Sequence, residues 1–505
     1  MSSQGSTSDL PKHDLRTFLA LLNENRELLK VDEQVDWDLE IGAVARRLCD
    51  RETNGVPSPA VLFENVKDYP GGRFFCNTLA SYRRYALALG LPIDTPISEI
   101  IATYSKRINT PIKPVEVKEA PCKENIIHEQ EVDLLKMFAT PKWHAEDGHR
   151  YIGTYHAIVV KDPDGPWVNW SLQRLGIHDE KSTGMLISYN SHAGKIYSKY
   201  EAIGKPMPVA VAIGLHPIDC IVASSGFPDQ VNEVDMAGAL RGAPIELVKC
   251  ETNDLLVPAG AEIILEGVVL PGERRKEGPL GEYTGYYSDK PSPKPVLHVK
   301  CITHRTRPIH QGSLEGVPIV DDHLMSSVAQ SGLCLNLLRD VLRIPGVKSV
   351  YFPPSATGWH LCIVSADRKG SPGLPVRITS AIWGSKFAAT QNMAGWVIVV
   401  DEDIDVTNMN QVIWSMISRC DPERGIQITR RRSAHLLLPA VSTDVRTKQR
   451  APSSSVMIDA GFPEEWYVAD PDSIQPVVNW DNLPGELKES ASGIVDRSLQ
   501  KFRDN

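Results

Sequence analysis

The spacing of apolar residues predicts helices near the N-terminus and short strands in the middle of the chain. Helical spacing occurs at Leu15–Lys30, Ile41–Cys49 and Ser98–Ile108. Between Tyr151 and Thr303, short β-rich runs alternate with Gly and Pro turns, which is typical of a barrel or sandwich. The predicted strands are Tyr155–Lys161, Pro208–Gly214, Glu262–Leu270 and Val296–Thr303.

The second half of the chain alternates between helical and strand patterns. The predicted helices are His323–Val341, Ile378–Thr390 and Met409–Ile417, and the predicted strands are Val347–Phe352, Trp359–Ser365 and Trp396–Val400. This alternation predicts a smaller layered domain. The Pro- and Asp-rich stretch Ser453–Pro484 is expected to be irregular. The amphipathic segment Leu487–Phe502 is expected to form a helix that packs on a neighbouring subunit.

Length and charge narrow the class of protein. A chain of 505 residues is expected to form two or three domains. A net charge of −9 argues against nucleic acid as a partner, and the basic run Arg430–Arg432 is too short to change that. Nine scattered cysteines without a CxxC pair suit reduced thiols. No secretory signal and no membrane-length apolar run is present, so we expect a cytoplasmic protein without membrane contact.

The common nucleotide and hydrolase motifs are absent. No GxGxxG follows a strand, and GxxxxGK[ST], HExxH and GxSxG do not occur. Three other segments concentrate polar groups in apolar or glycine-rich surroundings. They are Trp167–Arg174 with the following Ser191-His192, Ala223–Pro228 with the following Glu233, and Glu277–Tyr286.

Two sets of residues in these segments are candidates for chemistry. Glu277 and Glu282 lie five residues apart across a Gly-Pro turn, and two carboxylates that share one cleft have separated pKa values suited to acid–base work. The alternative is a surface loop with two solvated glutamates. Asn169, His192 and Glu233 would suit Mn²⁺ or Mg²⁺. The alternative is three unrelated polar residues.

The order of the motifs resembles one family. WxNWSxxR, a following histidine, ASS…P…E and EGPxGExxGYY closely resemble the UbiD-like decarboxylases, with the ferulic acid decarboxylases as the nearest branch. Pro121–Asn125 and the stretch from Glu246 to Gly267 strengthen the match. The resemblance runs from about Leu15 to the C-terminal helix.

The resemblance implies three cofactors and the residues that bind them. Mn²⁺ would be held by Asn169, His192 and Glu233, and K⁺ by Trp170, Ala223, Ser224, Gly226 and Glu233. Prenylated FMN would be bound by Asn169, Ser171, Leu172, Gln173, Arg174, Ser191, His192, Ser225, Glu233 and Lys386. It also implies an α+β multidomain fold with a central split β-barrel. The expected segments are a disordered leader (1–12), an N-terminal α/β region (13–120), the cofactor-binding barrel (121–320), a C-terminal α/β domain (321–450), and a linker with an oligomerisation helix (451–505).

The implied reaction is the reversible, non-oxidative removal of CO₂ from an aromatic, heteroaromatic or α,β-unsaturated acid, by way of a covalent adduct with the modified flavin. Loss of CO₂ from an sp² carbon leaves a carbanion that side chains stabilise poorly, so the cofactor must accept the electron pair. Arg174 would hold the substrate carboxylate, Glu282 would donate the proton, and Glu277 would tune Arg174 and help cofactor maturation.

The substrate pocket departs from the ferulate branch. The resemblance implies a pocket formed by Ile187, Tyr283, His435 and Leu437. Tyr283 stands where a methionine is expected, and His435 stands where a phenylalanine is expected. Both changes make the pocket more polar, although His435 could equally be a neutral substitution on the rim.

The expected partners are a flavin prenyltransferase, which supplies the cofactor, and a second copy of the chain, which forms a homodimer or a larger assembly. The rival functions are a Mn²⁺-dependent hydrolase and a non-catalytic carboxylase subunit.

Overall fold

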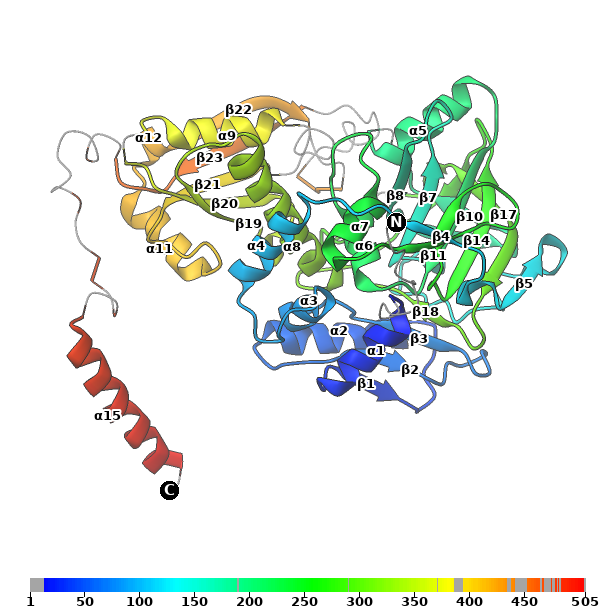
Figure 1. Cartoon of the computed structure of the whole chain (residues 1–505), viewed down its shortest axis with the longest axis horizontal. Helices are drawn as coiled ribbons and strands as arrows, with labels where there is room; N and C mark the ends of the chain where they lie inside the picture. Colours follow the sequence, from blue (N-terminus) through cyan, green and yellow to red (C-terminus); the bar gives the residue numbers. More distant parts are fainter. Residues whose placement is uncertain are drawn as a thin grey trace, which may run out of the picture.

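The computed structural model describes residues 13–188, 190–288, 290–369, 371–385, 394–433, 437–440, 452–463 and 483–503, with isolated residues 466, 474, 477, 478 and 480. The predicted leader (1–12), Lys386 and His435 lie outside these residues. The fold is a mixed α/β architecture of several sheets, as predicted at that level. In Figure 1 an N-terminal layer lies below the large central sheet, a C-terminal layer lies beside it, and α15 extends away from both.

The N-terminal layer is a four-stranded sheet flanked by helices. Its strand order is β1 (Leu28–Val31), β2 (Ala60–Phe63), β3 (Arg73–Cys76) and β18 (Ile309–Gln311). The helices are α1 (Leu15–Glu24), α2 (Glu40–Thr53), α3 (Tyr82–Ala88) and α4 (Ile97–Arg107).

The predicted helix Leu15–Lys30 is too long, because the chain leaves the helix at Asn25 and Leu28 enters strand β1. Arg26 has a φ of 58°, outside the right-handed helical region, which explains the break.

The central sheet follows the order β6-β9-β10-β17-β14-β11-β7-β8, with β5 added to β17. Its hydrogen-bonded path does not close among the described residues. The strands are β5 (Asn125–His128), β6 (Tyr151–Gly153), β7 (His156–Lys161), β8 (Val168–Ser171), β9 (Leu175–Asp179), β10 (Ser182–Met185), β11 (Met207–Ile213), β14 (Ile263–Val269) and β17 (Val296–His304). Two small sheets adjoin it. The first consists of β13 (Leu256–Pro258), β12 (Glu246–Lys249) and β4 (Val115–Val117), and the second consists of β15 (Arg275–Glu277) and β16 (Ser292–Lys294).

Three helices interrupt the region for which the sequence predicted only strands. They are α5 (His192–Ala202), α6 (Pro217–Ser224) and α7 (Glu233–Arg241). Their lengths of 11, 8 and 9 residues are too short for a clear helical repeat of apolar residues. Almost every residue of α6 is buried, so no polar face marks it as a helix.

The C-terminal layer is a five-stranded sheet in the order β19-β20-β21-β23-β22. Its strands are β19 (Val347–Tyr351), β20 (Leu361–Ala366), β21 (Trp396–Asp401), β22 (Ile426–Ser433) and β23 (Pro452–Asp459). Its helices are α8 (Asp321–Asn336), the π-helical turn Leu337–Val341, α9 (Leu374–Gly384), α11 (Met409–Arg419) and α12 (Pro422–Gly425). Short 3₁₀ turns occur at Pro121–Lys123, Glu129–Glu131 and Pro354–Ala356.

The expectation of an irregular stretch after Ser453 is wrong at its start. Strand β23 occupies this segment and pairs parallel with β21 and antiparallel with β22. Strand β22, which the sequence did not predict, contains the basic run, and Arg430 is exposed on it.

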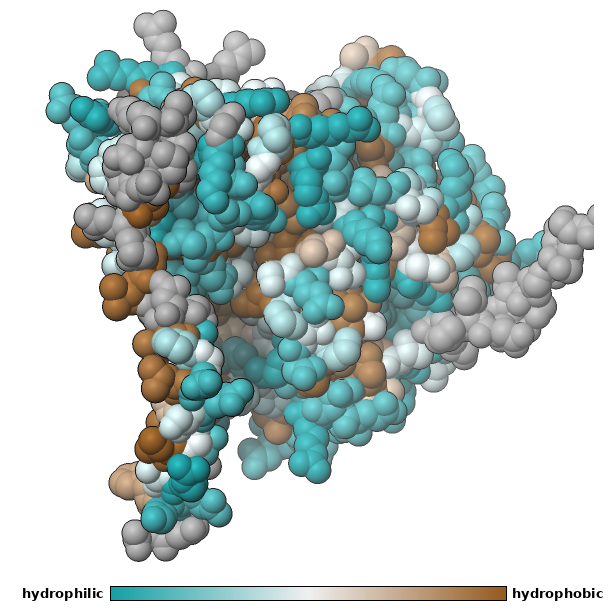
Figure 2. Space-filling model, turned by 60° about the vertical axis from the view of Figure 1, so that its left-hand side comes forward, coloured by the Kyte–Doolittle hydropathy of each residue, from teal (hydrophilic) through white to brown (hydrophobic). Residues whose placement is uncertain are grey.

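Helix α15 (Gly485–Arg503) leaves its apolar side uncovered. Figure 2 shows brown side chains along one edge of this projecting helix. The exposed apolar residues are Leu487, Ile494, Val495, Leu499 and Phe502, with exposed fractions of 47–81%. Among the described residues, no helix combines the length and hydrophobicity needed to span a bilayer.

Candidate active site

Arg174 joins two glutamates into a buried cluster. Its Nε and Nη2 donate to the two carboxylate oxygens of Glu277 at 3.0 and 2.8 Å, and its Nη1 bonds to Glu282. The three residues are 8%, 1% and 7% exposed. The surface-loop alternative for Glu277 and Glu282 is therefore wrong, because both carboxylates face one guanidinium in the protein interior.

A tight turn closed by one short pairing positions Glu282. Gly281 pairs with Tyr287 as an isolated bridge, and the Glu282 and Gly285 amides donate to the carbonyls of Tyr286 and Glu282 at 2.9 Å each. Gly285 has a φ of 85°, which only glycine adopts without strain. The Gly281 amide donates to Asp147 at 3.0 Å.

Glu277 is the last residue of strand β15, and the Tyr151 hydroxyl donates a hydrogen bond to its carboxylate at 2.8 Å. Tyr151 was missed by the sequence analysis. It lies in the three-residue strand β6, and nothing in its surroundings separates it from an ordinary core tyrosine.

The electrostatics of the cluster raise the pKa of Glu282 above its ordinary value. Burial raises the pKa of Glu282; the charge of Arg174 opposes this rise, and the carboxylate of Glu277 adds to it. Burial alone would lower the pKa of Arg174, but the two carboxylates outweigh it and raise that pKa. A neutral Glu282 beside an ion pair of Arg174 and Glu277 leaves the enclosed cluster without net charge, which limits the desolvation penalty.

More carboxylates with raised pKa values lie near Glu282. Burial raises the pKa of Asp322 to about 7, and the charge of Glu282 contributes. Burial also raises the pKa of Glu315 well above its ordinary value, with Asp322 and Glu282 as the next causes. The surroundings of Glu282 therefore favour protonated carboxyl groups at neutral pH.

Asn169, His192 and Glu233 meet at a second buried point. Asn169 lies in β8, His192 is the first residue of α5, and Glu233 is the first residue of α7. Asn169 Nδ2 donates to Glu233 at 2.9 Å, and His192 Nδ1 lies 3.5 Å from the same oxygen. The other Glu233 oxygen accepts from the Trp170 amide at 2.8 Å. The alternative of three unrelated polar residues is therefore wrong.

This second set fits a cation. Asn169 Oδ1 is buried and has no hydrogen-bond partner among the described residues, although buried polar atoms are nearly always paired. An amide oxygen, an imidazole and a carboxylate form a donor set that Mn²⁺ accepts. Within the described ranges no three or more His, Cys, Asp or Glu residues form a metal-binding group, and the predicted set contains only two such residues. Asp229, also missed by the sequence analysis, lies 3.0 Å from His192 Nε2.

Apart from Lys386, the other predicted binding residues lie on or next to β8, α5 and α6. Trp170 and Ser171 are in β8, Leu172 and Gln173 follow it, and Ser171 Oγ bonds to Gln173 at 3.1 Å. Ser191 caps α5 by accepting from the Gly194 amide at 3.1 Å. Ala223 and Ser224 end α6, which packs against β8, and Ser225 and Gly226 follow directly. Of the predicted pocket residues, Ile187 is buried, and Tyr283 and Leu437 are half-buried.

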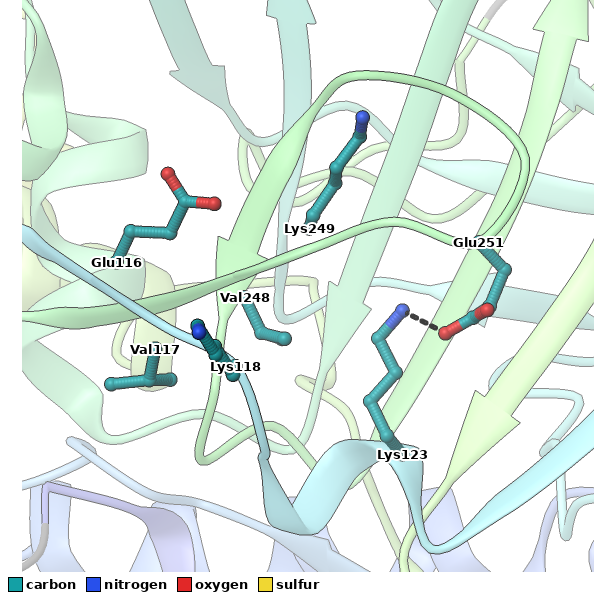
Figure 3. Close-up of a pocket in the computed structure, with 7 residues that line it drawn as sticks. All are labelled: Glu116, Val117, Lys118, Lys123, Val248, Lys249 and Glu251. Atoms are coloured by element: carbon teal, nitrogen blue, oxygen red, sulfur yellow. Dashed lines mark hydrogen bonds and ion pairs between the residues drawn. The ribbon is translucent and has the colours of Figure 1, made fainter.

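A separate open hollow lies over the small sheet of β13, β12 and β4 (Figure 3). Its volume is about 320 Å³, and it contains none of the predicted site residues. Two of its three lysines have acidic partners: Lys123 bonds to Glu251 at 2.6 Å, and Lys249 bonds to Asp254 at 2.6 Å. This pairing makes it an ordinary charged surface.

Comparison with known proteins assigns the chain to a family. The N-terminal, Rift-related and C-terminal domains of 3-octaprenyl-4-hydroxybenzoate carboxy-lyase match residues 19–104, 113–318 and 323–460. The chain belongs to the UbiD family. Pyrrole-2-carboxylic acid decarboxylase of Pseudomonas aeruginosa is 31% identical over 475 residues, which cover 90% of this chain and 92% of that protein.

Solved UbiD-class structures agree with this assignment. HmfF of Pelotomaculum thermopropionicum, an evolved dimeric form in complex with prFMN, is 29% identical with a TM-score of 0.77, covering 94% of this chain and 99% of that one. Vanillic acid decarboxylase of Sedimentibacter hydroxybenzoicus, in its closed form, is 27% identical with a TM-score of 0.83, covering 98% and 100%. The predicted family is confirmed, and the UbiD chain is a prenylated-FMN-dependent decarboxylase. None of these relatives is named a hydrolase, so that rival is not supported.

Proposed function

We propose that this decarboxylase removes CO₂ from an aromatic or heteroaromatic acid, with Glu282 as the proton donor. The observation that carries the proposal is the buried Arg174–Glu277–Glu282 cluster, in which burial raises the pKa of Glu282 beside a paired guanidinium. Prenylated FMN, when bound, supplies the electron sink that the departing carboxylate requires.

Arg174 positions the substrate in this proposal. It uses three of its N–H groups on the two glutamates, and guanidinium carries five, so two remain for a substrate carboxylate. Glu277, fixed by Tyr151, keeps the guanidinium plane in one orientation. Glu282 then holds the proton that replaces CO₂ on the product carbon.

The second set would hold the cofactor phosphate through metals. We propose that Asn169, His192 and Glu233 bind Mn²⁺, because Asn169 Oδ1 is a buried acceptor for which the described part of the chain offers no partner. The proposed K⁺ site uses Trp170, Ala223, Ser224, Gly226 and Glu233, and the remaining cofactor contacts are those given above, including Lys386. These two cations would offset the charge of a phosphate in a partly dry site.

The pocket suggests a substrate with a polar ring substituent. Tyr283 brings a hydroxyl, and the predicted pocket residue His435 an imidazole, where the ferulate branch is expected to carry methionine and phenylalanine. The Tyr283 hydroxyl has His360 Nε2 at 3.2 Å, so a polar ring substituent is proposed to pair with the His435 imidazole: a phenol, a pyrrole or indole N–H or a second carboxylate would supply that partner. The similarity to a pyrrole-2-carboxylic acid decarboxylase supports a heteroaromatic ring. The double variant Tyr283→Met/His435→Phe is expected to shift kcat/KM toward cinnamic-type acids.

The wider proposal covers assembly and location. The open central sheet is proposed to be the split barrel, within the domain boundaries 13–120, 121–320 and 321–450. The exposed apolar stripe of α15 supports a homodimer through the segment 451–505. A flavin prenyltransferase is the proposed cofactor supplier, and free cysteines, eight of them buried, suit a cytoplasmic location.

Cofactor dependence is the direct test. Protein co-expressed with a flavin prenyltransferase is expected to carry a flavin with the mass of prenylated FMN and to decarboxylate members of a panel of aromatic and heteroaromatic acids, with Mn²⁺ and K⁺ aiding reconstitution. Protein made without that enzyme is expected to be nearly inactive. Full activity of the apoprotein supplied with plain FMN would contradict the proposal.

A further inference from the structure

Tyr283, the residue after the proposed proton donor, is held at both ends by histidines from the C-terminal part of the chain. His323 Nε2 lies 2.6 Å from the Tyr283 carbonyl oxygen. His360 Nε2 lies 3.2 Å from the Tyr283 hydroxyl. His323 is in α8 and His360 precedes β20, so neither belongs to the segment that forms the Glu282 turn.

The backbone contact has a defined proton arrangement. The Val320 amide donates to His323 Nδ1 at 2.9 Å, so Nδ1 is the unprotonated nitrogen and Nε2 carries the hydrogen donated to Tyr283. Burial lowers the pKa of His323 to about 4, which keeps this ring neutral at physiological pH. His323 is fully buried, so this hydrogen bond is shielded from water.

The side-chain contact is a stacked one. The Tyr283 and His360 rings lie 6.1 Å apart with an interplanar angle of 22°, and Trp359 packs on Tyr283 at 6.3 Å. The phenol is therefore fixed by ring packing as well as by the hydroxyl contact. The His360 contact ties the Tyr283 side chain to the turn that precedes β20.

We infer that His323 and His360 form a clamp on Tyr283 that positions the Glu282 carboxyl for proton transfer. The two histidines are positioning residues, because they act on the turn and not on the reacting atoms. Arg174 bonds to the Glu282 carboxylate itself, and the other hydrogen bonds of the turn involve Asp147, Ser288 and Tyr286. The clamp thus links the proton donor to the C-terminal layer. A displacement of about 1 Å at a reacting group costs up to roughly 100-fold in rate, so this restraint is large enough to matter.

The inference rests on Glu282 as the proton donor, and the test separates the two. Tyr283→Phe removes the hydroxyl, His360→Leu removes its partner, and His360→Gln keeps a hydrogen-bonding side chain of similar reach. Tyr286→Phe is the matched control, since Tyr286 lies in the same turn with 60% of its surface exposed. Each variant is prepared as the cofactor-loaded enzyme, and kcat, KM, the solvent deuterium isotope effect, flavin content and the thermal midpoint are measured.

Tyr283→Phe and His360→Leu are each expected to lower kcat by about 10- to 100-fold. KM, flavin content and thermal midpoint are expected to stay near wild type, while the solvent isotope effect rises because protonation becomes slower. His360→Gln should recover most of the rate. The double variant should be no slower than the slower single variant, because both changes break one contact.

Three results would overturn the clamp. The first is a wild-type kcat in His360→Leu together with a lowered kcat in Tyr283→Phe, which would mean that the Tyr283 hydroxyl acts on the substrate. The second is wild-type kcat in both. The third is a loss of kcat that parallels a loss of flavin content or of thermal midpoint in every variant, which would mean that these residues only stabilise the packing of the fold. Retained activity in Glu282→Gln would instead reject the proposed proton donor.

Discussion

The two buried polar clusters of this UbiD enzyme differ in how complete they are. Around Arg174, both glutamates accept hydrogen bonds from the guanidinium, and Tyr151 adds another. Around Glu233, Asn169 Oδ1 has no partner among the described residues. The first cluster is balanced by protein groups alone, whereas the second has an acceptor that needs a ligand.

This difference indicates distinct tasks. A cluster that is complete without a ligand is preorganised, so little rearrangement is needed when charge moves during the reaction. A cluster with an unpaired acceptor gains stability when a cation binds, because the desolvation cost of that oxygen is then offset. The first cluster suits proton transfer, and the second suits the anchoring of a charged cofactor. Two variants test this contrast directly, and two further tests address the groups near the first cluster and the end of the chain far from both clusters.

The largest expected effect is that of Glu282→Gln. The amide cannot give a proton to the product carbon, so kcat is expected to fall by roughly 10² to 10⁴. Exchange of solvent deuterium into the product should fall in parallel. Glu146→Gln, an equal charge change at an exposed position near the same turn, is expected to leave kcat unchanged. If Glu282→Gln keeps more than about a tenth of the wild-type rate, Glu277 or water is the donor.

The second test removes the unpaired acceptor. Asn169→Leu keeps the approximate volume but deletes the amide oxygen, and the affinity for Mn²⁺ is expected to fall by about 10- to 100-fold, as for lost groups at other metal sites. Titration followed by calorimetry or by manganese paramagnetic resonance gives the affinity. Asn169→Asp keeps an oxygen and should retain Mn²⁺ binding, while the added charge beside Glu233 destabilises the metal-free form. Equal Mn²⁺ affinity in Asn169→Leu and wild type would exclude Asn169 as a ligand.

The third test uses pH. Burial raises the pKa of Asp322 to about 7 and that of Asp321 to about 6, both from 3.8. The folded state therefore holds protons that the unfolded chain releases. The stability from these groups is complete below pH 4 and is lost as pH rises through 6 and 7.

The contribution of Asp321 and Asp322 to the free energy of unfolding, measured in urea titrations, is expected to decline between pH 5 and pH 8, whereas buried neutral histidines such as His323 add stability as the pH rises from about 4 to 6.5. Asp322→Asn should make the pH slope less negative by up to about 1.4 kcal/mol per pH unit between pH 5 and pH 6, the value for one proton, and by about half of that at pH 7, where the folded-state carboxyl is half protonated. An unchanged slope in Asp322→Asn would show that its carboxyl does not take up a proton on folding. Carboxyl groups whose pKa is lowered in the folded state, such as Asp14, contribute stability that is lost at acidic pH. This loss limits the free energy of unfolding at the acidic end of the range.

The sequence predicted the site better than the elements that build it. Arg174, Glu277 and Glu282 are recognisable because they lie in ordered motifs with rare spacing. His192 and Glu233 were predicted to bind Mn²⁺, yet the helices that they begin, α5 and α7, were not predicted. These helices have only 11 and 9 residues, so too few apolar positions repeat in them for the helical period to stand out.

Tyr151 and His360 could not be predicted, because their importance comes from contacts with residues more than 70 positions away. The separation is 126 positions for Tyr151 with Glu277 and 77 positions for Tyr283 with His360. Strand β23 was missed because its neighbourhood is rich in Pro and Asp, although it becomes an inner strand between β21 and β22. Tertiary pairing decided its structure against its composition.

The smallest effect is expected from the end of the chain, far from both clusters. Removal of the residues after Pro484 deletes the exposed apolar stripe of α15. We expect the dimer to dissociate at least about tenfold more readily, because each apolar side chain of the stripe contributes about 1.5–3 kcal/mol when fully buried. The decarboxylation rate of each subunit is expected to stay unchanged. Val495→Asp places a charge in the stripe and should act in the same direction, whereas Gln500→Asp places it on the opposite side of the helix and should not. Sedimentation and light scattering of the full-length chain at micromolar concentration measure the assembly. A full-length monomer, or equal dimerisation of the two aspartate variants, would mean that α15 does not hold the subunits together.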